Sequence, residues 1–153
     1  MEMRQLGLEP GVELVELGPV IPPSEIAERL GLKAGDKALI RHRQMYAGGQ
    51  PMQLATSYVP WSFGGHADGR AGQRSGWHLL PPGRRGSRTR SLCRGGRNSH
   101  ADPEEARFLR LTDPQPVFNL FRTASDVSGA PVEVCEHVMS GDRWLLTYEW
   151  AAE

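Results

Sequence analysis

An internal repeat constrains the fold of this chain more than any other feature. Each unit contains a helix-like run, a strand-like segment, a turn and a second strand-like segment. The corresponding segments are Ile26–Leu32, Ala38–Tyr46 and Pro51–Pro60 in the first unit, and Ala106–Leu111, Val117–Asp126 and Pro131–Ser140 in the second. Arg43 matches Arg122 at an offset of 79 residues. Two such units predict a pseudo-symmetric sheet covered by helices, with a ligand cleft where the halves meet.

Local signals support the secondary structure expected of each unit. Glu25 falls in the first turn of a predicted helix, where the helix dipole favours an acidic side chain. Gly48-Gly49 lies between the strand-like segments of the first unit, and Ser128-Gly129 lies between those of the second. Glycine readily adopts the positive φ angles of tight hairpin turns. We therefore predict antiparallel hairpins over residues 38–59 and 117–140.

Two further strands are predicted outside the repeat. Val12–Leu17 alternates apolar and acidic residues, which is typical of an edge or outer strand, and Arg143–Trp150 is rich in Trp, Leu, Thr and Tyr and is predicted to close the sheet. Hairpins predominate over βαβ signals. The predicted fold is therefore α+β, with an antiparallel sheet, flanking helices and two pseudo-repeated helix–hairpin units.

Size and composition limit the classes of protein. A chain of 153 residues is expected to form a single domain over 1–153, and its net charge of +0 gives no overall attraction to nucleic acid or to an anionic membrane. No apolar run reaches the length of a membrane helix. Cys93 and Cys135 show no metal-ligand spacing, so we expect no metal, no cofactor and two free thiols in a cytoplasmic protein.

The segment 64–100 differs from the rest of the chain. It contains eight arginines, nine glycines and one acidic residue, and it has no lysine, valine, isoleucine or phenylalanine. This composition predicts a poorly ordered, poorly packed segment, because little apolar surface is available for burial. Three interpretations stay open: an Arg-rich module that binds nucleic acid, a solvated linker, and translation from a shifted reading frame.

The genetic code supports the frame-shift hypothesis, which we favour. Codons can be chosen for His66–Pro82 so that the same bases, read one nucleotide later, encode TPMAEQDSGPGGIYSRL. Ser91–Pro103 can likewise be decoded as RFVEEVGTRMPTP, which runs directly into the second predicted helix. The sequences encoded by the shifted frame contain a glycine turn, a helix start and a strand-like FVEEV. The shifted frame is predicted to cover about residues 64–103.

The flanking segments resemble a known family. EIAERLGLKAGDKALIRHRQMYAGGQPMQLATSYVP and PEEARFLRLTDPQPVFNLFRTASDVSGAPVEVCEHVMSGDRWLLTYEW resemble the UTRA domain, the effector-binding part of HutC-type regulators in the GntR superfamily. The resemblance covers about 1–63 and 101–153. It implies a chorismate lyase-like fold that binds a small metabolite and is a homodimer in its intact form. Family members carry a winged-helix DNA-binding domain before this one, and we expect that domain to be absent from the 153 residues.

Arg41 and Arg43 are the leading candidates for ligand binding. They lie two residues apart on a predicted strand, so their side chains are expected on one face of the sheet. Guanidinium groups bind phosphate and carboxylate through paired hydrogen bonds, although a solvated face with ion pairs explains the same spacing. The resemblance implies a small anionic metabolite as partner, namely a phosphorylated sugar or an organic acid.

Four further residues complete the predicted site. The hydroxyls of Thr56 and Ser57 can donate to ligand oxygens, although hydrogen bonds at a strand end explain them equally well. The resemblance implies a ligand-binding carboxylate at Glu133, although the residue taken alone is explained more simply as solvent-facing. Tyr148 can cover a ligand or pack in the core, and the core is the simpler interpretation.

An enzyme is the alternative class, because the chorismate lyase scaffold is catalytic elsewhere. We find no nucleophile, acid–base pair or metal set with persuasive spacing, so no catalytic residue is predicted. No helix-turn-helix pattern is present either, so we expect DNA contact only through the missing winged-helix domain. The prediction is an effector-sensing domain of a bacterial regulator, with a chorismate lyase-like enzyme or an Arg-rich nucleic-acid-binding module as the alternatives.

Overall fold

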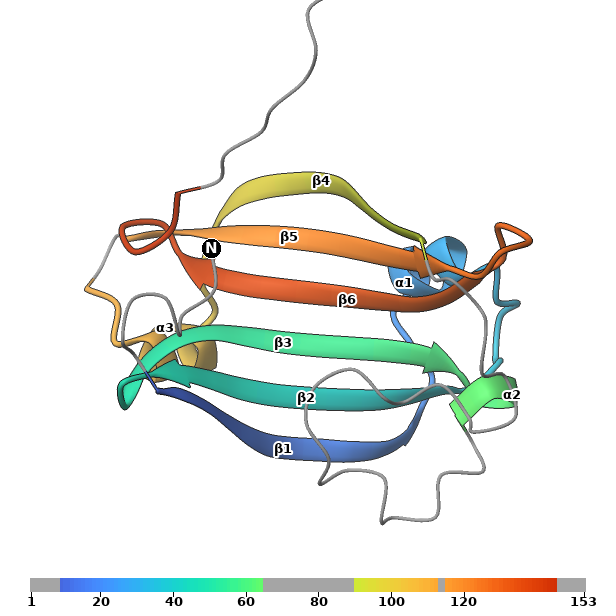
Figure 1. The fold of residues 1–153 in the computed structure, drawn as a ribbon, viewed down its shortest axis with the longest axis horizontal. Helices are drawn as coiled ribbons and strands as arrows, with labels where there is room; N and C mark the ends of the chain where they lie inside the picture. The colour runs from blue at the N-terminus through green and yellow to red at the C-terminus, as the bar shows by residue number, and fades with distance from the viewer. Residues whose placement is uncertain (1–8, 65–89, 113–114, 146–153) are drawn as a thin grey trace, which may run out of the picture.

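The computed structural model describes residues 9–64, 90–112 and 115–145, and these form one antiparallel sheet with three helices. The strands are β1 (Pro10–Val20), β2 (Ala38–Ala47), β3 (Gln50–Pro60), β4 (Arg90–His100), β5 (Pro116–Ser125) and β6 (Pro131–Ser140). The helices are α1 (Ser24–Leu30), α2 (Trp61–Gly64) and α3 (Pro103–Leu109). The strand order is β1-β2-β3-β6-β5-β4 (Figure 1). The predicted α+β fold is confirmed.

The two predicted hairpins are present and lie side by side. Gly48 and Gly49, with φ of 55° and 76°, form the turn between β2 and β3, and Gly129, with φ of 88°, lies in the turn between β5 and β6. Antiparallel pairing of β3 with β6 then joins the hairpins, with Ser57 opposite Cys135. The centre of the sheet is therefore the boundary between the two repeated units.

Each unit begins with a short helix that ends in a left-handed residue. In α1, Glu25 lies in the first turn as predicted, and Gly31 follows the helix with φ of 67°. In α3, the carboxylate of Asp102 accepts hydrogen bonds from the backbone N–H groups of Glu104 and Glu105, while the side chain of Glu105 accepts one from the Asp102 N–H. This reciprocal arrangement satisfies N–H groups that a helix start otherwise leaves without partners.

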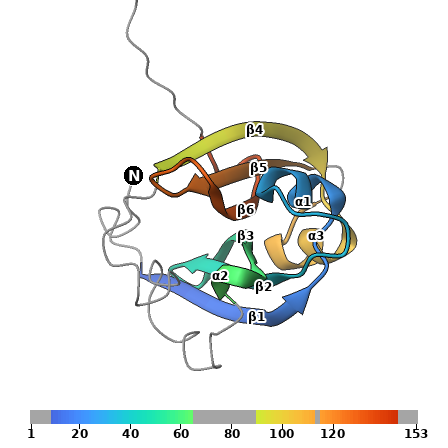
Figure 2. The same ribbon diagram turned by 90° about the vertical axis from the view of Figure 1, so that its right-hand side faces the viewer.

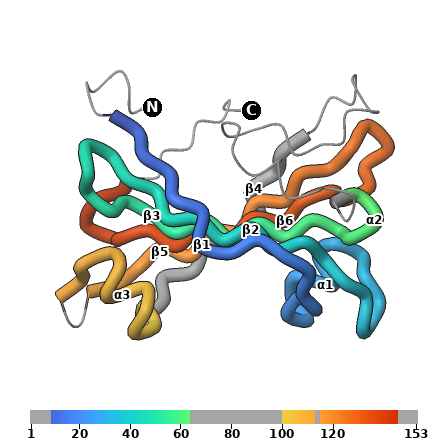
Figure 3. The backbone as a smooth tube through the Cα atoms, turned by 90° about the horizontal axis from the view of Figure 1, so that it is seen from below, coloured from blue at the N-terminus to red at the C-terminus, as the bar shows by residue number. Residues whose placement is uncertain are grey.

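Both repeat helices pack on the same face of the sheet (Figures 2 and 3). The core at α1 contains Ile26, Leu30, Ala38, Ile40, Tyr58, Phe121 and Val134, and the core at α3 contains Leu54, Leu109, Val117 and Val138. Because side chains alternate along a strand, the residues between these core positions lie on the opposite face. Arg41 and Arg43 flank His42 in this way, so they lie on the face away from α1 and α3.

The segments outside the repeat bring one confirmation and two corrections. The predicted strand Val12–Leu17 lies within the edge strand β1. Arg90–His100 forms the other edge strand by antiparallel pairing with β5, so the expectation of poor order is wrong for this backbone; residues 65–89 lie outside the described residues. The predicted strand Arg143–Trp150 is absent from its described part, residues 143–145, and the remainder lies outside the described residues.

The start of that last segment is held by side chains instead of strand pairing. Arg143 donates from Nη1 to the carbonyl of Pro51 at 2.9 Å, and Trp144 donates from Nε1 to the carbonyl of Met52 at 3.0 Å. These bonds attach the segment to the start of β3. In the part of the chain that the structure describes, no helix combines the length and the apolar character needed to span a membrane.

Candidate functional site

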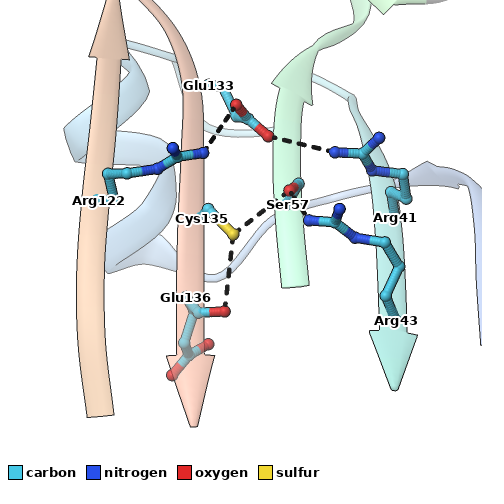
Figure 4. Close-up of polar contacts among 7 residues, drawn as sticks. All are labelled: Arg41, Arg43, Ser57, Arg122, Glu133, Cys135 and Glu136. Atoms are coloured by element: carbon cyan, nitrogen blue, oxygen red, sulfur yellow. Dashed lines mark hydrogen bonds and ion pairs between the residues drawn. The ribbon is translucent and has the colours of Figure 1, made fainter. Parts of the chain in front are cut away.

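A row of polar residues crosses the centre of the sheet on the face away from α1 and α3. The strand register pairs Arg41 with Ser57, Ser57 with Cys135, and Cys135 with Arg122. The row therefore runs across β2, β3, β6 and β5 and spans the boundary between the two units (Figure 4). Ser57 and Cys135 are almost fully buried at its centre.

Glu133 connects the two ends of this row. Its Oε1 lies 3.7 Å from Nη2 of Arg41, and its Oε2 lies 3.6 Å from Nη2 of Arg122 (Figure 4). The side chains of Arg41, Arg122 and Glu133 are only 15%, 20% and 22% exposed, so water screens their charges less than it screens those of a surface ion pair. One carboxylate thus bridges guanidinium groups from both repeats.

Arg43 completes the charged cluster. Its Nη2 donates to Oγ of Ser57 at 3.2 Å, and the Ser57 hydroxyl donates to Sγ of Cys135 at 3.4 Å. The Nε atoms of Arg41 and Arg43 are buried and have no hydrogen-bond partner among the described residues. Buried N–H donors of charged groups are normally paired, so these two sites retain unused donor capacity. We call Arg41, Arg43, Arg122 and Glu133 the guanidinium cluster.

The guanidinium cluster lies beside two titratable groups, His137 and Cys135, that burial holds in their neutral forms. Burial lowers the pKa of Arg41, with the adjacent Arg43 adding to the effect and Glu133 opposing it, but a guanidinium group stays protonated. Burial, with Arg122 and Arg43 nearby, lowers the pKa of His137 to about 4, so its ring is neutral at pH 7. Burial also raises the pKa of the Cys135 thiol. The only negative group in this row is therefore the carboxylate of Glu133 among the described residues.

The structure brings together most, but not all, of the predicted site residues. Arg41, Arg43, Ser57 and Glu133 converge as the sequence predicts. Thr56 does not join them: its Oγ1 lies 2.7 Å from Nδ1 of His42 on the helix-covered face. The prediction placed two consecutive strand residues in one site, although neighbours on a strand point to opposite faces. Tyr148 lies outside the described residues.

Arg122, Cys135 and His137 also lie on this face, although the sequence does not predict them as site residues. A signal for Arg122 was present, because it matches Arg43 in the repeat. The strand register then places Arg122 on β5 opposite Cys135, beside the boundary between the two hairpins. Within the described ranges, no set of three or more histidine, cysteine, aspartate or glutamate side chains is placed to hold a metal ion.

The chain thus combines an antiparallel sheet, covered by α1 and α3 on one face, with polar residues of both repeats gathered on the other face. Residues 5–144 match the model of the UTRA domain, so the chain belongs to the UTRA domain family. No curated protein matches the chain.

Solved structures with the same fold belong to GntR-family regulators. PhnF from Mycobacterium smegmatis is similar with a TM-score of 0.81 and 22% identity, over 98% of this chain and 66% of that chain. The effector domain of the same protein gives 0.76 and 23% identity, over 98% and 92%. A GntR-family transcriptional regulator from Bacillus cereus gives 0.79 and 17% identity, over 94% and 99%. The chain is thus a UTRA domain similar in fold to regulator effector domains, and it spans just under two thirds of PhnF.

Proposed function

We propose that this chain is the effector-sensing domain of a bacterial GntR-type regulator of the HutC subfamily and that its effector is a small anionic metabolite. The observation that supports the proposal is the guanidinium cluster, in which one carboxylate bridges Arg41 and Arg122 from the two repeats and Arg43 lies beside them on Ser57. The two buried Nε–H groups of Arg41 and Arg43 offer donors that an anion can use. Phosphate and carboxylate are the groups whose geometry suits such donors.

The proposed ligand contacts follow from this geometry. Arg41, Arg43 and Arg122 bind the anionic group, and Ser57, which already accepts a hydrogen bond from Arg43, holds that guanidinium in place. A phosphorylated sugar or an organic acid has the required charge, and any hydroxyl that it carries can donate a hydrogen bond to a carboxylate such as that of Glu133. No step of bond making or breaking is assigned to these residues, and we propose binding without turnover.

The remaining features of the proposal concern the intact regulator. A domain of this kind transmits effector binding to a DNA-binding domain, here proposed to be a winged helix, and we propose that the intact protein is a homodimer that works in the cytoplasm. The fold similarity to the PhnF effector domain supports the sensing role. In this proposal the UTRA domain contributes the ligand contacts and the winged helix contributes the DNA contacts.

Substitution of Arg43 tests the proposed site. A charge-assisted hydrogen bond contributes on the order of 1.5–3 kcal/mol, so Arg43→Ala should weaken binding of an anionic effector by roughly ten- to a hundredfold. Calorimetric titration with a panel of phosphorylated sugars and organic acids measures the loss. The same titrations, followed by analysis of the recovered ligand, report whether it has been converted.

Arg107→Ala is a matched control, since Arg107 is an exposed residue of α3, on the other face of the sheet. We expect it to leave anion affinity unchanged. Equal losses from both substitutions, or binding of neutral ligands alone, would contradict the proposed site. Conversion of a bound ligand would favour the chorismate lyase-like enzyme instead.

A further inference from the structure

We propose that Glu133 is a resident counter-ion of the guanidinium cluster, that the anionic group of the effector displaces it, and that this exchange selects doubly charged over singly charged anions. The inference rests on the proposed function, because it concerns the same cluster. It assigns Glu133 a role in the ligand-free domain that differs from direct contact with a ligand. Three observations support it: the length of its ion pairs, their bridging geometry and the charge balance.

The ion pairs of Glu133 are loose. At 3.7 Å to Arg41 and 3.6 Å to Arg122, both contacts are longer than the 2.7–2.9 Å typical of a charge-assisted hydrogen bond. The carboxylate satisfies no guanidinium N–H at close range, and the Nε–H of Arg41 has no hydrogen-bond partner in the described part of the chain. An anion with more oxygen atoms can make shorter bonds to the same donors, so it can compete with this carboxylate.

The bridging geometry makes the displacement an all-or-none exchange. Glu133 uses one oxygen for Arg41 on β2 and the other for Arg122 on β5 (Figure 4). An anion placed between these strands lies where the bridge is, and it takes over both contacts together. The exchange therefore involves both repeated units, one through each arginine.

The charge balance decides which anions gain from the exchange. Glu133 pairs with Arg41 and Arg122, whereas the guanidinium group of Arg43 has the neutral Ser57 hydroxyl and no carboxylate as its partner among the described residues. A singly charged anion that replaces Glu133 leaves the net charge of the cluster unchanged, so the Coulombic gain is small. A doubly charged anion neutralises one further guanidinium, in a setting where limited exposure keeps the interaction strong. Displacement of the Glu133 carboxylate thus costs as much Coulombic free energy as a singly charged anion regains, and only a doubly charged anion gains more than this cost.

Sulfate and methanesulfonate are a suitable pair of probes. Both are tetrahedral at sulfur, but sulfate carries two negative charges and methanesulfonate carries one. Calorimetric titration of the full chain should show at least about tenfold tighter binding of sulfate. In Glu133→Gln no carboxylate has to be displaced, so the affinity for methanesulfonate should rise by about tenfold and the preference for sulfate should narrow.

Two further variants control the experiment. Glu133→Asp keeps the charge but shortens the side chain, so it cannot reach both arginines, and it should give an intermediate affinity for methanesulfonate. Glu136→Gln removes a carboxylate from the same strand on the opposite face, where Glu136 accepts a hydrogen bond from Asn119. This variant should keep the sulfate preference of the unaltered chain.

Thermal unfolding gives an independent measurement. Without anion, Glu133→Gln removes the carboxylate that bridges Arg41 and Arg122, so its unfolding midpoint should lie below that of the unaltered chain and sulfate should raise it by more. If the unfolding midpoint of Glu133→Gln falls without any change in anion affinity, Glu133 has a structural role alone. That result would overturn the proposed counter-ion role.

The results separate this inference from the proposed function. If the unaltered chain binds anions and Glu133→Gln weakens that binding, Glu133 is a direct ligand contact. Only the proposed counter-ion role is then overturned. Equal affinity of the unaltered chain for both probes would also overturn it. If neither protein binds either probe, the anion site itself is wrong and the proposed function fails with it.

Discussion

His137 lies on the same sheet face as the guanidinium cluster and is mostly withdrawn from water. Its burial, with Arg122 and Arg43 nearby, lowers the pKa of its imidazole from 6.5 to about 4. In the unfolded chain this ring is protonated near pH 6.5, whereas in the folded chain it is protonated only near pH 4. The unfolded state therefore binds more protons between these values. The resulting stability is fully present above pH 6.5 and is lost as the pH falls toward 4.

We expect protonation of this ring to lower the free energy of unfolding by up to about 1.4 kcal/mol for each unit that the pH falls within that window. Urea unfolding at pH 7 and pH 5 measures the loss. In His137→Gln the loss should become smaller, because glutamine does not titrate. His100→Gln changes an exposed histidine and should preserve it. An identical pH dependence in His137→Gln and the unaltered chain would show that the ring does not couple to folding.

Strand alternation predicts which residues of one strand share a face, and only this part of the candidate site could be predicted from the sequence. The spacing of Arg41 and Arg43 places both on one face without knowledge of the fold. The choice between Thr56 and Ser57 needs the pairing of β3 with β2, which places Ser57 opposite Arg41. Arg122 enters the site through the pairing of β3 with β6, which joins distant parts of the chain. Such long-range register is not encoded in any local pattern.

At the scale of elements, the ends of α1 and α3 invite a direct comparison. Gly31 and Arg110 occupy equivalent places after the two helices, and both are left-handed, with φ of 67° and 53°. A side chain with a Cβ adopts this conformation at a cost of roughly 1–2 kcal/mol, whereas glycine does so readily. Arg110 gains little in return, because its hydrogen bond to Gln50 is long, at 3.4 Å, and exposed.

Arg110→Gly is therefore expected to stabilise the domain by about 0.5–1 kcal/mol, after the greater freedom of glycine in the unfolded chain is counted. The midpoint of urea unfolding measures the gain. Arg107→Gly is the matched control, since it places the same substitution inside α3 and should destabilise by about 1 kcal/mol. Destabilisation by both substitutions would mean that the Arg110 side chain contributes more than its backbone conformation costs.

The elements that sequence predicts well are those with local signals. The turn glycines and the helix starts identify both helix–hairpin units, and the structure confirms them. Arg90–His100 lacks β-branched and aromatic residues, so nothing local predicts β4, and its strand conformation comes with the backbone ladder to β5. Arg143 and Trp144 have strand-like composition, but their side chains instead anchor the chain to carbonyls of β3.

At the scale of the whole molecule, the repeat and the site are one arrangement. Pairing of β3 with β6 places the two hairpins side by side, and the same pairing brings Arg41 and Arg122 to opposite sides of one carboxylate. Helices α1 and α3 cover only the other face (Figure 3). A ligand at the guanidinium cluster thus contacts both units, so binding is expected to couple the two halves of the sheet.

The frame-shift hypothesis makes a prediction about the stability of the whole chain. The alternative decoding of Ser91–Pro103 places the strand-like FVEEV within β4, where the present chain has Arg and Gly residues. Valine and phenylalanine favour a paired strand more than glycine does. A chain with the restored frame should therefore unfold more cooperatively, with a steeper thermal transition.

Two measurements test the hypothesis together. Sequencing of the coding DNA across residues 60–105 should reveal where single-base changes near residues 64 and 103 restore the frame. Calorimetry of the restored chain and of the present chain then compares the two transitions, and a calorimetric enthalpy closer to the van't Hoff enthalpy is expected for the restored chain. An equal or sharper transition in the present chain would show that its Arg- and Gly-rich segment completes the fold as well as the sequence encoded by the shifted frame. That result would contradict the hypothesis.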